Sequence, residues 1–197
     1  YEIGYRLVGS DMCIRDSICY LSRQISILGR KEVLSGRGKF GIFGDGKELP
    51  QVAMAKVFKK GDFRSGYYRD MTFEIAIGLV NTENLFSYVY GNPDPVLEPM
   101  SSGRQMIGHY NSDVLDDVGN LIPFTENKNS FSDVSSTASQ MPRLLGLAYA
   151  SKFFKKHPDA IDKSLSNNGN EIAWGTIGNA STSEGLFFET INAAGVM

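Results

Sequence analysis

The stretch that most constrains the fold lies near the C-terminal end, at residues 171–195. Residues 172–177 form a near-continuous apolar run, which is typical of a strand covered on both faces. Gly178 then provides a turn, and Ser181 and Glu184 have the spacing of a capping box at the start of a helix. The stretch therefore predicts an α/β fold with an open, mostly parallel sheet flanked by helices.

Two interpretations of this strand, turn and helix are open from the residues alone. A well-capped unit of this kind can serve the fold without binding anything. Yet polar residues gather at the carboxyl end of the expected strand, where open α/β sheets bind their ligands. A glycine turn and a helix N-terminus together suit a phosphate and its metal ion. Under this second interpretation, other segments must supply the remaining groups of a phosphate site.

Composition and charge exclude several classes of protein. With 197 residues, 42% of them hydrophobic and 21% charged, the chain fits one soluble globular domain. Its net charge of −2 gives no electrostatic reason to expect a nucleic acid or a membrane as partner. No apolar run is long enough to span a bilayer. The two cysteines have neither metal-ligand nor disulfide-framework spacing, so we expect a reducing, cytoplasmic location.

Residues 1–17 differ from the rest and are expected to be a non-native or disordered extension. They have no helical or strand period and no signal-peptide layout. Part of them, Met-Cys-Ile-Arg-Asp-Ser, resembles peptides translated from sequencing-adapter DNA. The domain is expected to begin at Ile18, where apolar residues at spacings of three and four predict a helix over residues 18–30.

Several segments downstream place glycine, arginine or histidine at expected turns and loops. Residues 36–46 are rich in glycine, but no buried strand precedes them, so a turn into a helix at residues 50–60 is favoured over a phosphate loop. Arg69 precedes an apolar segment, and the stretch by itself favours a salt bridge over an anion clamp. His109 lies in a loop and is a candidate acid, base or polar anchor.

Residues 111–130 are predicted to form a surface loop, and helices are predicted at residues 81–90 and 141–156. Ser139 is expected to cap the second of these helices. A cap explains only one or two of the five hydroxyl residues in the stretch 131–140. The others could line an anion or monovalent-cation site.

Four segments stand in a fixed order along the chain: Gly66-Tyr-Tyr-Arg-Asp70, Gly103-Arg-Gln-Met-Ile-Gly-His-Tyr110, Ser139-Gln-Met-Pro-Arg-Leu-Leu-Gly146 and Gly178-Asn-Ala-Ser-Thr-Ser-Glu-Gly185. Together they resemble the decarboxylating component of the thiamine-diphosphate-dependent 2-oxo acid dehydrogenases. The likeness runs from Ile18 to the last residue and is to the α-type part of the branched-chain 2-oxoisovalerate and pyruvate enzymes. It is especially similar to bacterial members with fused α and β parts. It implies the thiamine-diphosphate-binding fold.

The resemblance implies a set of residues around the cofactor diphosphate. Tyr68 and Arg69 match a tyrosine–arginine pair at the diphosphate, so the clamp interpretation of Arg69 now outweighs the salt bridge. Gly178, Ala180 and Ser181 match the turn whose amides meet the same group. These five residues are therefore expected to bind the cofactor.

The resemblance also implies roles at the reacting end of the cofactor. Ser135 and Thr137 match a loop that reaches its thiazolium and pyrimidine rings. His109 matches a loop histidine near the cofactor and the substrate, which makes it the catalytic candidate.

The metal ions implied by the resemblance are less well matched. Asn179 stands where the family has Asp or Glu as a Mg²⁺ ligand, so it offers a carbonyl oxygen without the charge. One hypothesis is that a carboxylate in the family's second metal segment compensates. Ser136, Ser139 and Gln140 match a K⁺-binding loop of some members, but Val134 replaces a serine of that loop.

The resemblance implies oxidative decarboxylation of a 2-oxo acid, of the branched-chain 2-oxoisovalerate type or pyruvate, with acyl transfer to a lipoyl-bearing acyltransferase subunit. It also implies a β-type part, fused or separate, and an oligomer. Residues 18–197 are then the N-terminal part of the α-type domain, truncated after the first metal-motif strand and helix, and this piece alone is expected to be inactive. Two alternatives stand beside this: a non-catalytic α-type scaffold of a multienzyme assembly, and a non-oxidative thiamine-dependent decarboxylase or carboligase.

Overall fold

The computed structural model describes residues 2–105, 107–160 and 162–197, with side chains apart from those of residues 2–11 and 160. The chain forms two compact units, Tyr1–Val57 with Arg69–Gly108 and Phe58–Tyr68 with His109–Met197. It therefore passes from one unit to the other three times, and the second passage falls between Tyr68 and Arg69.

The first unit is built from helices. These are α1 (Glu2–Leu34), α2 (Glu48–Val57), α3 (Met71–Ile77) and α4 (Thr82–Tyr90). α1 contacts each of the other three, and α2 also packs on α3. Arg23 of α1 donates two hydrogen bonds, at 2.7 and 3.0 Å, to the Glu48 carboxylate at the start of α2. This contact lowers the pKa of Glu48 to about 2.

α1 begins earlier and ends later than the helix predicted at residues 18–30. Its buried positions also differ from the predicted apolar stripe. Ile25 is buried as predicted, but Ser22 and Ser26 are also nearly inaccessible, whereas Leu28 is 47% exposed. Small side chains on the buried face allow neighbouring segments to approach closely. That residues 1–17 are a non-native extension stays a prediction.

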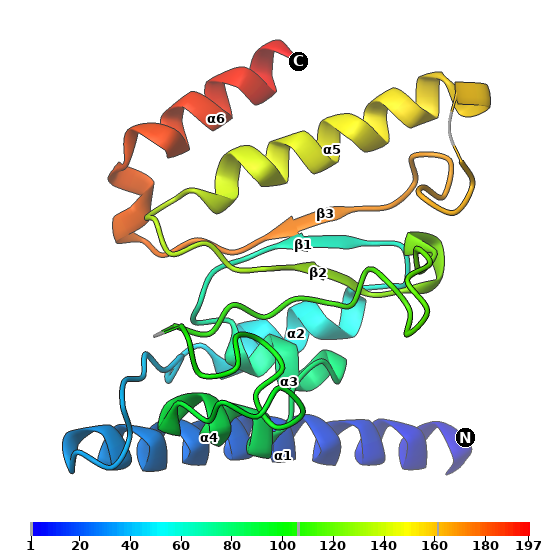
Figure 1. The fold of residues 1–197 in the computed structure, drawn as a ribbon. Coiled ribbons are helices and arrows are strands. Elements are labelled where there is room, and N and C mark those ends of the chain that lie inside the picture. The colour runs from blue at the N-terminus through cyan, green and yellow to red at the C-terminus, as the bar shows by residue number, and fades with distance from the viewer. Residues whose placement is uncertain (1, 106, 161) are drawn as a thin grey trace. The chain divides into compact units, whose positions relative to one another are not determined.

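The second unit contains the sheet, whose strand order is β2-β1-β3 with both pairings parallel. The strands are β1 (Phe63–Ser65), β2 (Asn129–Phe131) and β3 (Ala173–Gly175). In Figure 1, α5 (Gln140–Lys156) lies along β1 and β3, and α6 (Gly185–Val196) packs against α5. Three 3-10 turns are η1 (Phe124–Glu126), η2 (Pro158–Ala160) and η3 (Ala180–Ser183). The predicted α/β fold with a parallel sheet is confirmed.

The strand, turn and helix near the C-terminal end are present, but their details differ from those expected. The strand predicted over residues 172–177 is shorter, and the predicted capping box is wrong. Ser181 lies inside η3, where its amide donates to the Gly178 carbonyl at 3.0 Å. α6 begins only at Gly185, and Glu184 before it makes no side-chain cap bond.

The predicted helices agree well with the structure away from this stretch. α4 and α5 match the helices expected at residues 81–90 and 141–156 to within one residue. α2 starts two residues before the predicted stretch 50–60 and ends three before its end. Ser139 immediately precedes α5, but its side chain makes no cap bond. Within the described part of the chain, no helix is both long and apolar enough to cross a membrane.

Two of the three strands were not predicted from the sequence. Residues 111–130 were expected to be a surface loop, but β2 begins within them, at Asn129. Asn129 and Ser130 are buried. β1 contains Arg64 and Ser65, both completely inaccessible. Polar side chains in these strands hide the apolar pattern by which a buried strand is recognised.

Candidate functional site

Polar side chains of the second unit gather at the carboxyl ends of its three strands. Ser65 ends β1, Asp133 follows β2, and Thr176 follows β3. Because the strands are parallel, these ends share one edge of the sheet. This is the edge at which open α/β sheets bind their ligands.

A buried ion pair joins β1 to the segment after β2. Arg64 and Asp133 are fully inaccessible, and Nη2 of the arginine donates to Oδ1 of the aspartate at 2.8 Å. Arg64 also donates through Nη1 to Ser130 Oγ at 2.9 Å. A side chain on Gly66 would collide with the guanidinium, so glycine there leaves room for the pair. The pair holds the segment after β2 against the sheet.

His109 is held in one orientation by the same segment. Its Nδ1 is hydrogen-bonded to the carbonyl oxygen of Asp133, and its Nε2 lies 3.1 Å from Ser135 Oγ. Since a carbonyl oxygen can only accept, Nδ1 carries the proton of the neutral ring. In this tautomer Nε2 presents its lone pair to the Ser135 hydroxyl. Ser135 is exposed, so this contact lies at the surface of the unit.

The hydroxyl-rich loop between β2 and α5 carries local backbone strain. Ala138 is 1% exposed and has a φ of 63°, in the left-handed region that non-glycine residues rarely adopt. Ser135, Ser136 and Thr137, which precede it, are all exposed. The loop thus buries one small apolar side chain and leaves its hydroxyls accessible.

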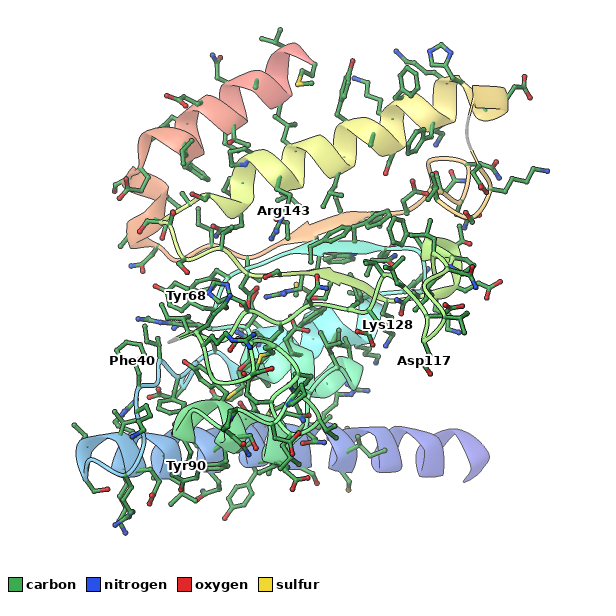
Figure 2. All side chains as sticks on the ribbon, viewed as in Figure 1. Phe40, Tyr68, Tyr90, Asp117, Lys128 and Arg143 are labelled. Carbon is green, nitrogen blue, oxygen red and sulfur yellow. The ribbon has the colours of Figure 1, made fainter. Side chains whose placement is uncertain are left out.

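A chain of hydrogen bonds links β1, α5 and the exit of β3. Ser65 Oγ donates to the Gln140 carbonyl at 2.9 Å and accepts from Arg143 Nε at 2.8 Å. Gln140 Nε2 donates in turn to the Thr176 carbonyl at 2.8 Å. Figure 2 shows Arg143 reaching from α5 toward the sheet, where burial lowers the pKa of its guanidinium. The network fixes the peptide that leads into the glycine turn at Gly178.

The glycine turn is open on its outer side. Asn179 and Ala180 are exposed, and Ser181 is half-buried. The Asn179 carbonyl accepts from the amide and the hydroxyl of Thr182, at 3.3 and 2.6 Å. The side-chain amide of Asn179 makes no hydrogen bond to any described residue, so its oxygen faces solvent.

Metal ligands of the usual kind do not cluster in the described residues. No group of three or more His, Cys, Asp or Glu side chains in that part of the chain could hold an ion. Asn179 offers one neutral oxygen, which compensates the charge of a divalent ion less well than a carboxylate.

Arg69 begins a segment of the first unit, whereas Tyr68 ends a segment of the second. Gln51 of α2 donates through Nε2 to the Arg69 carbonyl at 2.9 Å and accepts through Oε1 from the Phe73 amide at 3.1 Å. A side chain on Gly44 would collide with the same Arg69 carbonyl. Contacts with Gln51 and Gly44 therefore fix the backbone at Arg69, and with it the position of the Arg69 Cβ atom.

The structure brings part of the predicted site together. His109 and Ser135 are in contact, and Thr137 lies two residues further along the same loop. Arg64 and Asp133, which fix the segment that orients the histidine, were not predicted. They are 69 residues apart in sequence, so only the register of the sheet reveals the pair.

Comparison with known proteins identifies the family. The sequence model for the dehydrogenase E1 component matches residues 18–197, which include every predicted site residue. No curated protein matches the chain. E1 components depend on thiamine diphosphate, serve as 2-oxo acid dehydrogenases and work in multienzyme complexes. The chain, with its parallel sheet and the polar edge that carries His109, belongs to the dehydrogenase E1 component family.

Proposed function

We propose that the protein is the α-type part of an enzyme that decarboxylates a 2-oxo acid, either 2-oxoisovalerate or a related branched-chain acid or pyruvate. The acyl group then passes to a lipoyl-bearing acyltransferase subunit. The observation that carries this proposal is the contact between His109 and Ser135 at the carboxyl edge of the sheet. An imidazole held in one tautomer beside an exposed hydroxyl suits proton transfer, whereas a non-catalytic scaffold has no need of it.

The donor set of the second unit fits thiamine diphosphate. The loop offers exposed hydroxyls at Ser135 and Thr137 and an acceptor nitrogen at His109, which suits a ring bearing both an amino group and ring nitrogens. The turn at Asn179 and Ala180 exposes the start of η3, where amides suit phosphate oxygens. When bound, the cofactor supplies the carbon nucleophile and the electron sink for decarboxylation.

Residues of the chain position the reacting groups and transfer the proton. His109 holds or delivers a proton at Nε2 while Nδ1 stays bonded to the Asp133 carbonyl. Ser135 and Thr137 orient the reacting groups. The ion pair of Arg64 with Asp133 keeps this loop in place, so little reorganisation is needed during the reaction.

The diphosphate end is bound by a second group of residues in this proposal. Gly178 and Ala180 offer backbone amides, and Tyr68 offers a phenol. Ser181 offers its hydroxyl, because its amide already donates to the Gly178 carbonyl. Arg69 offers a guanidinium, which matches phosphate oxygens in pairs. The fixed backbone at Arg69 supports this role, because a clamp needs a defined starting point.

Magnesium binding is assigned to Asn179, whose exposed side-chain oxygen makes no hydrogen bond to any described residue. The phosphate oxygens of the cofactor and a carboxylate from outside the described residues would complete the ion's shell. Mg²⁺ titration of the enzyme and of Asn179→Asp tests this. If the wild-type enzyme binds Mg²⁺ at micromolar to millimolar concentrations, a carboxylate elsewhere compensates for the missing charge of Asn179. If only Asn179→Asp binds Mg²⁺, that hypothesis is wrong. K⁺ at Ser136, Ser139 and Gln140 is a further proposal, although the Gln140 amide already donates to a backbone carbonyl.

Two partners complete the proposed enzyme. A β-type part, fused or separate, shares the active site, and the assembly is an oligomer. The acyltransferase subunit accepts the product on its lipoyl arm. E1 components work in such complexes, which supports both partners.

Product analysis tests the proposed reaction. The enzyme, assembled with its β-type part, is incubated with thiamine diphosphate, Mg²⁺, lipoamide and either 2-oxoisovalerate or pyruvate. We expect CO₂ and acyl-dihydrolipoamide in equal amounts, both dependent on the cofactor. Formation of an aldehyde or a carboligation product would contradict acyl transfer to lipoamide and would show that the reaction is non-oxidative. If the protein binds the cofactor but releases no CO₂ from any 2-oxo acid, the remaining interpretation is a non-catalytic scaffold.

A further inference from the structure

The residues directly after His109 lie along β2, an end strand of the sheet. The Ser112 amide donates to the Ser130 carbonyl at 2.8 Å, as in a pair of strands. The return contact uses a side chain, because the Ser130 amide donates to Ser112 Oγ at 2.9 Å. That hydroxyl donates in turn to the Lys128 carbonyl at 2.7 Å. Ser112 therefore fastens this segment to β2.

Asn111 connects the same segment to the residues that follow β2. Its Oδ1 accepts from the Ser132 amide at 3.1 Å, and its Nδ2 donates to the Ser112 carbonyl at 2.8 Å. An amide N–H can only donate and a carbonyl can only accept, so these two bonds fix which way the side-chain amide points. One side chain thus links the backbones of two segments that lie 21 residues apart in the sequence.

His109 is the next member of this series of contacts. Its Nδ1 is hydrogen-bonded to the carbonyl oxygen of Asp133, one residue beyond Ser132. The contacts of residues 112, 111 and 109 therefore reach residues 130, 132 and 133, in the reversed order of an antiparallel pair. If the two segments slipped against each other, the ring would lose the Asp133 carbonyl. The register of this pairing decides whether Nδ1 meets its acceptor.

Asn111 holds this register from the surface, whereas Ser112 holds it from inside. Ser112 is buried, and without its hydroxyl the buried Ser130 would lose an acceptor for its amide, at a cost in stability. Asn111 is exposed, so its two hydrogen bonds can be removed with little effect on folding. Its contribution to the orientation of the neighbouring ring can therefore be measured apart from the stability of the unit.

We propose that Asn111 is a positioning residue for His109. It holds the register at which Nδ1 meets the Asp133 carbonyl, and so keeps the proton on Nδ1 and the lone pair on Nε2. This effect on the ring follows from contacts within the second unit alone. Its consequence for catalysis rests on the proposed function, in which Nε2 handles a proton. The motif at residues 103–110 ends just before Asn111 and does not include it.

Nitrogen NMR of the protein, labelled isotopically at histidine, measures the tautomer of each ring without reference to activity. Spectra are recorded at about pH 8, where free imidazole is largely neutral. Asn111→Leu removes both hydrogen bonds at similar volume, so the ratio of the Nδ1–H to the Nε2–H tautomer of His109 should fall about ten-fold. Asn111→Ala should give the same result. Asn111→Asp keeps an acceptor for the Ser132 amide and should retain most of the wild-type ratio.

The assembled enzyme shows whether this positioning matters for the reaction. Across wild type, Asn111→Asp and Asn111→Leu, kcat for CO₂ release should fall in proportion to the remaining Nδ1–H population of His109. The KM for the 2-oxo acid and the Kd for thiamine diphosphate should stay within about two-fold of wild type, because the variants change proton transfer and not binding. A general loss of structure would change all three quantities.

Two controls accompany these variants. His157, the second histidine of the chain, is exposed at the end of α5, so its tautomer ratio should be the same in every variant. The matched variant is Asn120→Leu, because Asn120 is an exposed asparagine of the same unit whose side chain donates to Asp116 at 3.1 Å. It should leave the His109 ratio unchanged, and circular dichroism should show that the variants are folded.

The outcomes separate the positioning role from the proposed reaction. If folded Asn111→Leu and Asn111→Ala keep the wild-type tautomer ratio of His109, the proposal is overturned, whatever reaction the enzyme catalyses. If the ratio falls and kcat does not follow it, Asn111 positions the ring and the proposed proton transfer by His109 is wrong.

Discussion

The buried pair of Arg64 and Asp133 allows a stability prediction with a defined magnitude. Asp133→Asn keeps the shape of the side chain and one acceptor oxygen but removes its charge. The Arg64 guanidinium then stays fully buried without the charge of Asp133, and it keeps its hydrogen bond to Ser130 Oγ. Because removing one member of a buried ion pair is strongly destabilising, we expect the free energy of unfolding to fall by about 3 kcal/mol. That is a large share of the roughly 5–15 kcal/mol that stabilises a typical domain.

Urea unfolding followed by tryptophan fluorescence measures this change. Trp174 is the single tryptophan of the chain, lies in β3 and donates its indole N–H to Asp62 at 3.0 Å. Its emission therefore reports on the unit that contains the pair. The matched control is Asp117→Asn, because Asp117 is an exposed aspartate of the same unit (labelled in Figure 2). The control should change the free energy of unfolding by no more than about 0.5 kcal/mol.

A double substitution separates the charge effect from simple loss of packing. Arg64→Met combined with Asp133→Leu removes both charges together, so it should cost less than the two single substitutions added. If Asp133→Asn has the same free energy of unfolding as wild type, the buried ion pair does not stabilise the unit. A double variant whose loss equals the sum of the single losses would show that the two side chains are not coupled.

Two further predictions concern single polar contacts. The pKa of Glu48, lowered to about 2 by Arg23, lies below its unfolded value of about 4.3, so the stabilisation is present above about pH 4 and lost as the pH falls toward 2. Acid unfolding followed by circular dichroism should show a weaker pH dependence in Glu48→Gln, and an unchanged profile would count against the contact. Ser135→Ala should leave stability within about 0.5 kcal/mol of wild type, because the side chain is exposed. It should nevertheless slow decarboxylation about ten-fold, since His109 loses its hydrogen-bond donor; an unchanged steady-state rate would remove Ser135 from the site.

The sequence predicts helices better than strands in this protein. α4 and α5 were located to within a residue. β1 and β2 are three residues long and contain buried polar side chains, Arg64 in one and Asn129 in the other. These side chains are tolerated inside because they donate hydrogen bonds to segments distant in the sequence. A local apolar pattern cannot identify such strands.

The candidate site could likewise be predicted only in part from the sequence. The motif that contains His109 and the loop that contains Ser135 are visible in the sequence through their resemblance to one family. What orients them is not visible, because Asp133 acts on His109 through a backbone carbonyl and on Arg64 through its carboxylate. The glycine-rich segment 36–46 indicated only a turn, and the folded chain shows that part of it lines a pocket.

The measurement that tests the central claim most directly compares wild type with His109→Asn in the assembled enzyme. The affinity for thiamine diphosphate and the rate of CO₂ release from a 2-oxo acid are measured separately. The histidine is proposed to handle a proton at Nε2, so the variant should bind the cofactor with an affinity within about three-fold of wild type and release CO₂ on the order of 10²-fold or more slowly. A variant that binds the cofactor and decarboxylates at the wild-type rate would contradict the account.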